Sequence, residues 1–536
     1  AMQKTETFDA IVVGSGMTGG VAASELCKAG LKVLVLEAGG AQDDLRSDQG
    51  IHAEQRFAGH QVQNKCYAFA EATSQLFVND HDNPYLVSPE QPFSWIRARA
   101  VGGRSLLWAG HCYRMTDAEF RAAREDGIGE NWPICYQEIA PYYDKAERLL
   151  GVRSRSFTNA RNEACLAHDE THFGEAFARL GPALIRARVS FYGGERTPCL
   201  HCGRENAFCS RPVSSPNSTL AEAFSTGRMQ LWTESPVRHI EIAGNGRHAR
   251  ICGIRRKTGQ VFEVCGRLVF LCASTLESTR ILLNSTSSRF PNGLGNSSGV
   301  LGRYLMDHVS GISVTGVFNR DIPPNEGAGA GMFYVPNWQE PCSSRNRGFS
   351  RGYGYQLFTM RADHELLPCG GTKLIPVQQS ESASGNAMVR IVGFGEMLPY
   401  DNNYVEIDKE GGKDADGIPI LRISCSLRDN EKSMAKHMLA SAQELLQSAH
   451  VKVTDIQTGP AEPGLAIHEA GTCRMGSDAR TSMLNSFNQC HDVPNVFVTD
   501  GSSFPSIGVQ NPVLTMVALT IRACECAVQQ LRKGET

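Results

Sequence analysis

The chain has 536 residues, 41% of them hydrophobic and 20% charged, which is ordinary for a soluble globular protein. This length suits one or two domains around a large buried core. The net charge of −3 provides no basic footprint for nucleic acid or an anionic membrane surface, and no apolar run reaches membrane-spanning length. We therefore expect neither nucleic acid nor a membrane among its partners.

The 18 cysteines are scattered along the chain and do not form a short disulfide-rich framework. The N-terminal residues also lack a basic segment followed by an apolar one, which is the pattern of a secretory signal. We therefore expect reduced thiols and a cytoplasmic location.

The N-terminal segment has the element order of a nucleotide-binding unit. An apolar strand pattern over 8–13 leads into a glycine turn, and a helical pattern follows over 21–29. Residues 32–36 form a second apolar strand pattern, and an acid, Glu37, comes directly after it. Strand, glycine turn, helix, strand and acid in this order predict a dinucleotide-binding βαβ unit.

Three glycines and the acid have separate roles in that prediction. Gly14 permits the tight turn, Gly16 lets a pyrophosphate approach the backbone, and Gly19 lets helix and strand pack closely. Glu37 follows Gly14 by 23 positions, where an acid can bind the ribose hydroxyls of an adenine nucleotide. The alternative is a plain glycine turn with Glu37 as a solvated acid. The pattern alone does not separate FAD from NAD.

Further along, two long stretches are weakly patterned. Residues 155–227 are expected to be rich in loops, and residues 322–386, with many Gly, Ser and Pro, to form mobile loops or a lid. The other patterns predict, in chain order, two short strands within 261–271, a helix from Ser274, antiparallel strands within 403–423, a helix over 429–449, a strand over 495–499 and a last helix from Asn511-Pro512.

One histidine has a setting that favours catalysis. Oxidation of an alcohol requires a base for the hydroxyl proton and an acceptor for the hydride, and histidine suits the first role. His468 lies in EPGLAIHEAGTCRMG, where an apolar segment precedes it and small residues follow, so that a large ligand could lie against the backbone. We expect His468 to be the base.

Asn511 is the second candidate and allows two interpretations. It precedes Pro512 and an apolar helix with Leu514, Val517 and Ala518 on one face, which is typical of a helix N-cap. The same amide could instead orient the substrate oxygen, and one side chain cannot fully serve both roles. In either case the helix N-terminus presents positive dipole charge to a developing anion.

At this point the chain resembles the glucose–methanol–choline (GMC) oxidoreductases over nearly its full length. Six motifs occur in the family order: the nucleotide fingerprint, GGRSLLW from Gly102, STLESTRILLNS from Ser274, LGRYLMDH from Leu301, HEAGTCRMG from His468 and NVFVTDGSSFPSIGVQNPVLT from Asn495. Within the family, NWPICYQEIAPYYDKAERLLG from Asn131 is most similar to the pyranose oxidase and glycoside 3-oxidase or 3-dehydrogenase branch.

The resemblance implies an α/β (α+β) fold, with a Rossmann-like FAD-binding domain of GMC type and a substrate-binding domain built on a mostly antiparallel sheet. We expect the FAD-binding domain to comprise 1–155, 228–310 and 465–536. A loop-rich, cysteine-containing insertion would cover 156–227, and the substrate-binding domain 311–464.

The resemblance also implies residue roles. His468 corresponds to the catalytic base and Asn511 to its partner. The cofactor-binding residues implied in addition to the N-terminal four are Gly102, Gly103, Ser105, Asp500 and Gly501.

Leu107 is a departure from some members of the family, which bind FAD covalently through a histidine directly before the tryptophan of this motif. Here Leu107 precedes Trp108, and a leucine cannot form that bond. His111 is nearby but does not align with the attaching histidine. We expect non-covalent FAD.

A cysteine group in the insertion could supply metal ligands. Cys199, His201, Cys202 and Cys209 suit zinc or an iron–sulfur centre, but only two cysteines have tight spacing and a four-cysteine set is missing. We therefore expect no metal.

Taken with the resemblance, these residues predict FAD-dependent oxidation of a secondary alcohol on a sugar or glycoside, with C3 of a pyranose as one position. A proton would be abstracted and a hydride transferred to flavin N5, and O2 or another acceptor would take the electrons. The alternatives are a dehydrogenase of another polyol or natural-product sugar alcohol, and a flavin electron-transfer subunit without its own substrate. The sequence leaves the oligomeric state open.

Overall fold

A computed structural model provides the fold. It describes residues 6–41, 59–71, 73–154, 163–191, 212–243, 246, 248–320, 331–336, 347–361, 364–366, 372–374 and 386–534.

The first layer is a seven-stranded sheet in the order β7-β2-β1-β10-β9-β8, with β20 also paired to β10. Its core is parallel, whereas β9 and β8 extend it as antiparallel strands. The strands are β1 (Glu6–Val13), β2 (Val33–Leu36), β7 (Met229–Trp232), β8 (Val237–Ile242), β9 (Ala249–Arg255), β10 (Gln260–Leu271) and β20 (Val496–Val498).

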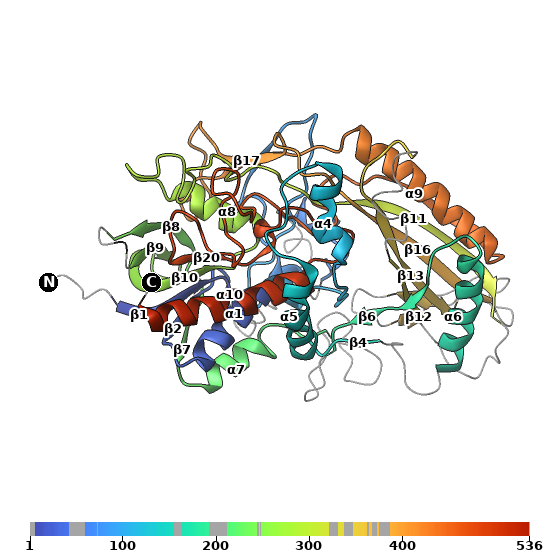
Figure 1. The fold of residues 1–536 in the computed structure, drawn as a ribbon, viewed down its shortest axis with the longest axis horizontal. Helices are drawn as coiled ribbons and strands as arrows, with labels where there is room; N and C mark the ends of the chain where they lie inside the picture. Colours follow the sequence, from blue (N-terminus) through green and yellow to red (C-terminus); the bar gives the residue numbers. More distant parts are fainter. Residues whose placement is uncertain are drawn as a thin grey trace.

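This sheet is buried on both faces, which explains why its parallel strands are almost wholly apolar. Ala10 and Val12 of β1 pack with helix side chains on one face, and Ile11 and Val13 with a second apolar cluster on the other. Figure 1 shows α1 and α10 lying beside this sheet. The helices of this half are α1 (Met17–Lys28), α4 (Asp117–Asp126), α5 (Tyr136–Leu149), α7 (Thr219–Ser225), α8 (Thr275–Asn284) and α10 (Val513–Lys533).

The second layer is a six-stranded antiparallel sheet in the order β19-β11-β16-β13-β12-β5. Its strands are β5 (Ile185–Arg186), β11 (His308–Asn319), β12 (Gly331–Val335), β13 (Tyr353–Arg361), β16 (Asn386–Glu396) and β19 (Lys452–Thr458). Two helices, α6 (Glu163–Ala178) and α9 (Asp429–Ser448), cover its outer face (Figure 1).

Successive side chains of β13 point alternately to the two faces of this second sheet, one facing the hydrophobic core and the other facing a cavity. Tyr355 and Leu357 are fully buried in the cluster with α6 and α9. The intervening Gln356 and Phe358 point to the opposite face, as the twofold period of a strand requires, and line a cavity. The sheet thus presents selected side chains to the space between the layers.

Smaller elements complete the fold. They are β3 (Leu86–Val87), β4 (Arg153–Ser154), β6 (Arg188–Val189), β14 (His364–Leu366), β15 (Thr372–Leu374), β17 (Tyr404–Ile407) and β18 (Leu421–Ser424), with short 3-10 helices η1 (Gln63–Lys65), η2 (Ser74–Leu76), η3 (Gly103–Leu106) and η6 (Gly501–Ser503). None of the described helices is long and apolar enough to cross a membrane.

The two-layer α/β architecture and most expected elements are confirmed, but three expectations were wrong. Residues 260–271 form one long strand and not two short ones. The region 155–227 includes the 16-residue helix α6. The region 322–386 includes β12 and β13, which are integral strands of the second sheet. The expected lid concerns the remainder of that region, most of which lies outside the described residues.

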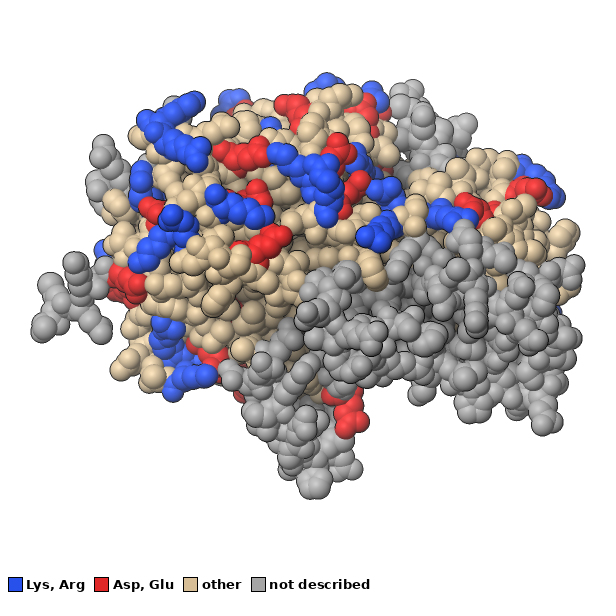
Figure 2. All heavy atoms as spheres, turned by 90° about the horizontal axis from the view of Figure 1, so that it is seen from below, with Lys and Arg blue, Asp and Glu red and all other residues tan. Residues whose placement is uncertain are grey.

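Figure 2 shows one face of the molecule, on which described basic and acidic side chains are interspersed. Some surface charges of the described residues are paired across elements, such as Lys28 of α1 with Glu222 of α7 at 2.8 Å.

Candidate active site

A cavity of about 760 Å³ lies between the two sheets and is lined by residues of both. It brings together nine of the eleven expected site residues, namely Gly14, Gly16, Glu37, Gly103, Ser105, His468, Asp500, Gly501 and Asn511. Gly19 and Gly102 do not line it. Gly19 instead packs beneath Gly14, where an added Cβ would lie 2.0 Å from the Gly14 carbonyl oxygen.

The first glycine turn leaves room where a ligand must approach. Gly14 has φ +98°, and a Cβ there would lie 2.4 Å from the carbonyl oxygen of Cys272, so only glycine fits. Gly16 differs, because its added Cβ would meet no described atom closer than 4.0 Å. This open backbone at the start of α1 fits the phosphates of a dinucleotide at a helix N-terminus.

A second glycine segment faces the first. Gly102 has φ +105°, and its N–H donates to the Ser15 hydroxyl at 3.0 Å. A Cβ on Gly103 would come no nearer than 3.6 Å, and its nearest neighbour would be the Cα of Gly16. Side chains at Gly16 and Gly103 would therefore fill the space between the two segments. Ser105 braces this turn by donating to the Gly102 carbonyl at 2.6 Å.

Glu37 stabilises the glycine turn between β1 and α1 through hydrogen bonds. Its carboxylate accepts from the Ser15 N–H at 3.0 Å, the Ser15 hydroxyl at 2.6 Å and the Gly39 N–H at 2.7 Å. A carboxylate has about four acceptor positions, so capacity for one ribose hydroxyl remains.

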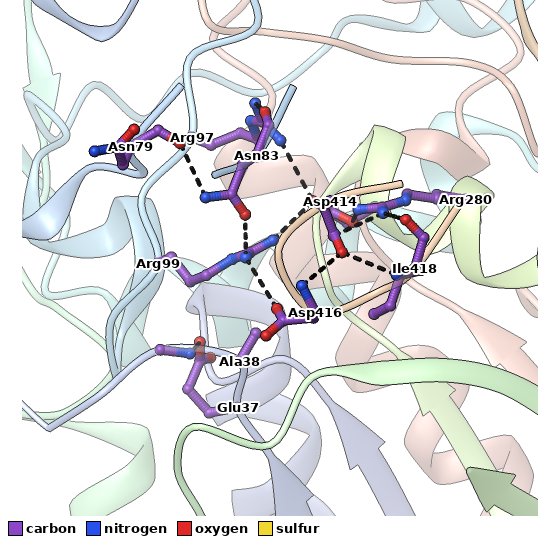
Figure 3. Close-up of polar contacts among 12 residues, drawn as sticks. Glu37, Ala38, Asn79, Asn83, Arg97, Arg99, Arg280, Asp414, Asp416 and Ile418 are labelled. Carbon is purple, nitrogen blue, oxygen red and sulfur yellow. Dashed lines mark hydrogen bonds and ion pairs between the residues drawn. The ribbon is translucent and has the colours of Figure 1, made fainter. Parts of the chain in front are cut away.

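An arginine–carboxylate network closes the end of the cavity near Glu37. Figure 3 shows Arg99 extending between Asn83 and Asp416, with Arg280 bound to Asp414 beside them. The buried Arg280–Asp414 ion pair measures 2.8 Å. Because Asp414 and Asp416 come from the segment between β17 and β18, this network ties that segment to α8 and to the chain around Arg99.

Two residues that line the cavity have a buried polar atom without a partner. Nδ2 of Asn284 and Oε1 of Glu469 are buried without a hydrogen-bond partner among the described residues, and both residues line the cavity. The second oxygen of Glu469 accepts from Arg104 at 2.6 Å. Buried polar groups are normally paired, so these atoms fit a polar ligand that fills the cavity.

Asp500 and Leu107 complete the cofactor wall. The Asp500 carboxylate caps η6 by accepting from the Ser502 N–H at 3.1 Å, and burial raises its pKa. Leu107 lines the cavity and is only 4% exposed within an apolar cluster that includes Cys66 and Ile96. The residue directly before Trp108 is thus in position to touch a cofactor that it cannot bond.

Asp307 fixes the loop that delivers His468. Its carboxylate accepts from three backbone N–H groups, those of Gly464 at 2.7 Å, Ala466 at 3.2 Å and His468 at 3.1 Å. Ile467 has φ +61°, a strained conformation for a β-branched residue. Such strain persists only where surrounding contacts over-determine the backbone, as they do here, and it is typical of functional sites.

A chain of hydrogen bonds, from the Gly508 carbonyl through three side chains, then sets the protonation of His468. His308 Nε2 lies 2.9 Å from the Gly508 carbonyl oxygen, which can only accept, so Nε2 must be protonated. In a neutral ring, His308 Nδ1 is then an acceptor for His468 Nδ1–H, 2.9 Å away. His468 Nε2 therefore presents its lone pair, towards Asn511 Nδ2 at 3.2 Å.

Burial keeps both histidines neutral. Desolvation lowers the pKa of His308 to about 4. Desolvation, followed by the effects of His308, Arg104 and His111, lowers the pKa of His468 well below its usual range. His468 is therefore a neutral base at pH 7 whose free nitrogen is fixed by its neighbours.

The Asn511 amide is held beside His468 by hydrogen bonds and does not cap α10. Its Oδ1 accepts from Gln356 Nε2 at 2.9 Å, while its Nδ2 is directed at His468. The helix cap position falls on Pro512, and no side chain makes a cap hydrogen bond there. The N-cap interpretation was therefore wrong, because the amide is already engaged at both ends.

Sequence reasoning missed three members of this site. Asp307 and His308 end the LGRYLMDH motif, which pointed to the family but not to their contacts. Gln356 lies on a strand in a region that we expected to be loop. Strand alternation within 353–361 is the signal that could have revealed it.

Two groups bear on metal binding. Cys199, His201, Cys202 and Cys209 lie outside the described residues. Elsewhere, His239, Glu241 and Cys252 on β8 and β9 place their potential ligand atoms within 4.8 Å of one another. Glu241 is also paired with Arg250 at 3.4 Å, and burial raises the pKa of the Cys252 thiol to about 11.

Comparison with known proteins identifies the family of this chain. The N-terminal family model of the GMC oxidoreductases matches residues 8–310, and the C-terminal model matches residues 399–520. The chain belongs to the GMC oxidoreductase family. It is thus an oxidoreductase of a flavoprotein family whose members bind FAD and whose relatives are named as oxidases and dehydrogenases of CH–OH groups.

Two relatives and one solved structure illustrate this membership. The 2-methyl-1,2-propanediol dehydrogenase of Mycolicibacterium austroafricanum is 27% identical, with 96% of this chain and 94% of that protein covered. The C-glycoside 3-oxidase of Microbacterium trichothecenolyticum is 24% identical, with 79% and 74% covered. The formate oxidase structure of Aspergillus oryzae RIB40, from a study of FAD modification, shares the fold with a TM-score of 0.63, 14% identity and 100% coverage of both chains.

Proposed function

We propose that this protein uses FAD to oxidise a secondary hydroxyl of a sugar or glycoside to a ketone. The observation that supports this most is the neutral His468, whose free Nε2 lines the cavity beside Asn511 Nδ2. An alcohol oxygen that displaces the hydrogen bond from Asn511 Nδ2 to His468 Nε2 could give its proton to His468 and accept a hydrogen bond from Asn511. The similarity to a C-glycoside 3-oxidase favours a pyranose and carbon 3.

The proposed cofactor is non-covalent FAD. Gly14, Gly16 and Glu37 would hold its nucleotide half, and Gly103, Asp500 and Gly501 its flavin half. When bound, FAD supplies the hydride acceptor. The residues of this chain supply the rest: they orient the hydroxyl, remove its proton at Nε2 of His468 and exclude water.

Proton removal at His468 matters because an alcohol is a poor hydride donor until its oxygen begins to lose its proton. General base catalysis of this kind typically contributes a factor of about 10² to 10⁴. The N-terminus of α10, beside Asn511, adds positive dipole charge where negative charge develops.

The test is anaerobic bleaching of the flavin spectrum by a panel of monosaccharides, methyl glycosides and simple diols. We expect bleaching by a sugar or glycoside. Bleaching by diols alone would favour the second candidate, a dehydrogenase of another polyol, which the similarity to a diol dehydrogenase supports. Bleaching by a chemical reductant alone would overturn the proposal and favour an electron-transfer subunit without its own substrate.

The electron acceptor, O2 or another oxidant, remains part of the proposal, and an oxygen electrode during turnover would identify it. We also propose the cytoplasm as the location, which buried free thiols such as those of Cys112, Cys272 and Cys473 support.

A further inference from the structure

His111 is a cavity residue that the proposed chemistry does not use. It comes shortly after the glycine segment at 102–103 and Leu107, is only 4% exposed, and lines the same cavity as His468 and Asn511. It is also close enough to His468 to be among the charges that depress the pKa of that residue.

The His111 ring is held in one orientation. Nδ1 lies 2.9 Å from the Tyr113 hydroxyl, and the Tyr113 ring stacks on Tyr334 at 3.8 Å. On the other side, Phe358 of β13 meets the imidazole edge-on, with ring centroids 6.1 Å apart. These contacts leave Nε2 as the free end of a fixed ring.

Nε2 of His111 has no hydrogen-bond partner among the described residues, although the side chain is almost wholly buried. Nε2 is accessible from the cavity that His111 lines, so a ligand in the cavity can pair with it. Desolvation lowers the pKa of His111 to about 4, so the ring is neutral at pH 7. A neutral ring nitrogen either donates or accepts, depending on the tautomer, and a hydroxyl group satisfies both cases.

β13 relates His111 to the reaction centre. Gln356, which binds Asn511, and Phe358, which contacts His111, are two residues apart on the same face of this strand. Such positions are separated by roughly 7 Å. His111 and the His468–Asn511 pair therefore lie beside neighbouring positions of one strand and line the same cavity.

We propose that Nε2 of His111 binds a second hydroxyl of the substrate, away from the one that is oxidised. This proposal rests on the proposed function and narrows it to polyhydroxylated substrates. A site built to hydrogen-bond a hydroxyl discriminates strongly against the analogue that lacks it, because its own polar group is then left unpaired. Monohydric alcohols and one particular deoxy sugar would thus be poor substrates.

The experiment compares kcat/KM for two probe series. One is methyl glucopyranoside with its monodeoxy analogues, and the other is the cyclohexanediols with cyclohexanol. In the wild type, loss of one non-reacting hydroxyl should lower kcat/KM by about 10- to 100-fold. In His111→Phe, which keeps a flat ring against Phe358, that preference should fall to within about threefold, because only the hydroxylated substrate loses a contact.

Two matched variants separate recognition from a structural effect. His111→Gln retains a hydrogen-bonding group and should restore part of the preference. Tyr113→Phe removes the hydroxyl near Nδ1 but leaves Nε2, and should keep most of it. A purely structural role would lower kcat/KM equally for both members of each pair.

If His111→Phe keeps the wild-type ratio of kcat/KM between the hydroxylated and deoxy substrates, this inference is overturned. Flavin bleaching by a sugar would still uphold the proposed function. Equal kcat/KM for all members of both series in the wild type would overturn it as well. If neither series bleaches the flavin of the wild type, the inference falls, and the wider sugar and diol panel then decides whether the proposed function falls with it.

Discussion

At the scale of single residues, the site depends on which ring nitrogen bears a proton. The Gly508 carbonyl oxygen fixes the tautomer of His308, and His308 in turn fixes that of His468. The unprotonated nitrogen of His468 is therefore set by a backbone carbonyl two hydrogen bonds away. Neither bond involves the substrate.

The pH dependence of flavin reduction tests this arrangement. Because the pKa of His468 is depressed well below its usual range, the neutral, active form should predominate at all pH values near neutrality. The anaerobic reduction rate should rise with pH only in the acid range, with its half-maximum below pH 6.5, the ordinary value for histidine. Stopped-flow traces between pH 4.5 and 8 would measure it. A half-maximum at pH 6.5 or higher would show that the base is not held neutral by burial.

Single residues also show where sequence reasoning ends. The need for a base and the HEAGTCRMG motif were enough to select His468. The two interpretations of Asn511 could not be separated, because a helix N-cap and a substrate-binding amide occupy the same sequence position. Only the contacts with Gln356, 155 positions away, and with His468 excluded the N-cap, while the substrate-binding role stays a prediction.

At the scale of elements, the segment 102–108, of which Gly103, Ser105 and Leu107 line the cavity, bears on how FAD would be held. Leu107 lines the cavity at the position of the attaching histidine of some relatives. We therefore predict that acid precipitation releases the yellow colour into the supernatant. Leu107→His provides the control, since it restores a side chain able to form the bond. Colour that stays with the wild-type pellet would show covalent attachment through another residue.

Elements with a clear hydrophobic period in the sequence could be predicted. Strands that are defined by pairing with partners distant in the sequence could not. α9, with its long helical pattern, and the hairpin of β17 and β18 were expected at nearly the observed positions. β10 was divided in two because its exposed first half alternates and its buried second half does not. β12 and β13 were assigned to a loop because Gly- and Ser-rich neighbours obscured them, and their pairing partners are distant in sequence.

At the scale of the whole molecule, burying neutral histidines makes the fold sensitive to acid. The folded pKa values of His111 and His308 are about 4, below the ordinary 6.5 of an unfolded chain. The unfolded state therefore binds more protons between these values, and stability is lost as the pH falls from about 6.5 towards 4. Each histidine should lower the free energy of unfolding by roughly 2 kcal/mol between pH 7 and pH 5.

Thermal denaturation at pH 7 and pH 5 would measure this loss. Buried carboxylates with raised pKa values, such as Glu119 and Glu396, act in the opposite direction, so the informative quantity is a difference between proteins. The melting temperature of the wild type should fall more between the two pH values than that of His111→Phe. Identical shifts in both proteins would argue that His111 is not buried in its neutral form.

The central claim is that His468 accepts the hydroxyl proton, and the most direct measurement is stopped-flow reduction of the flavin in His468→Ala. With a sugar or glycoside that bleaches the wild type, the variant should reduce its flavin about 10² to 10⁴ times more slowly while still binding FAD. Reduction within a factor of a few of the wild-type rate would mean that the base lies elsewhere and that this mechanism is wrong.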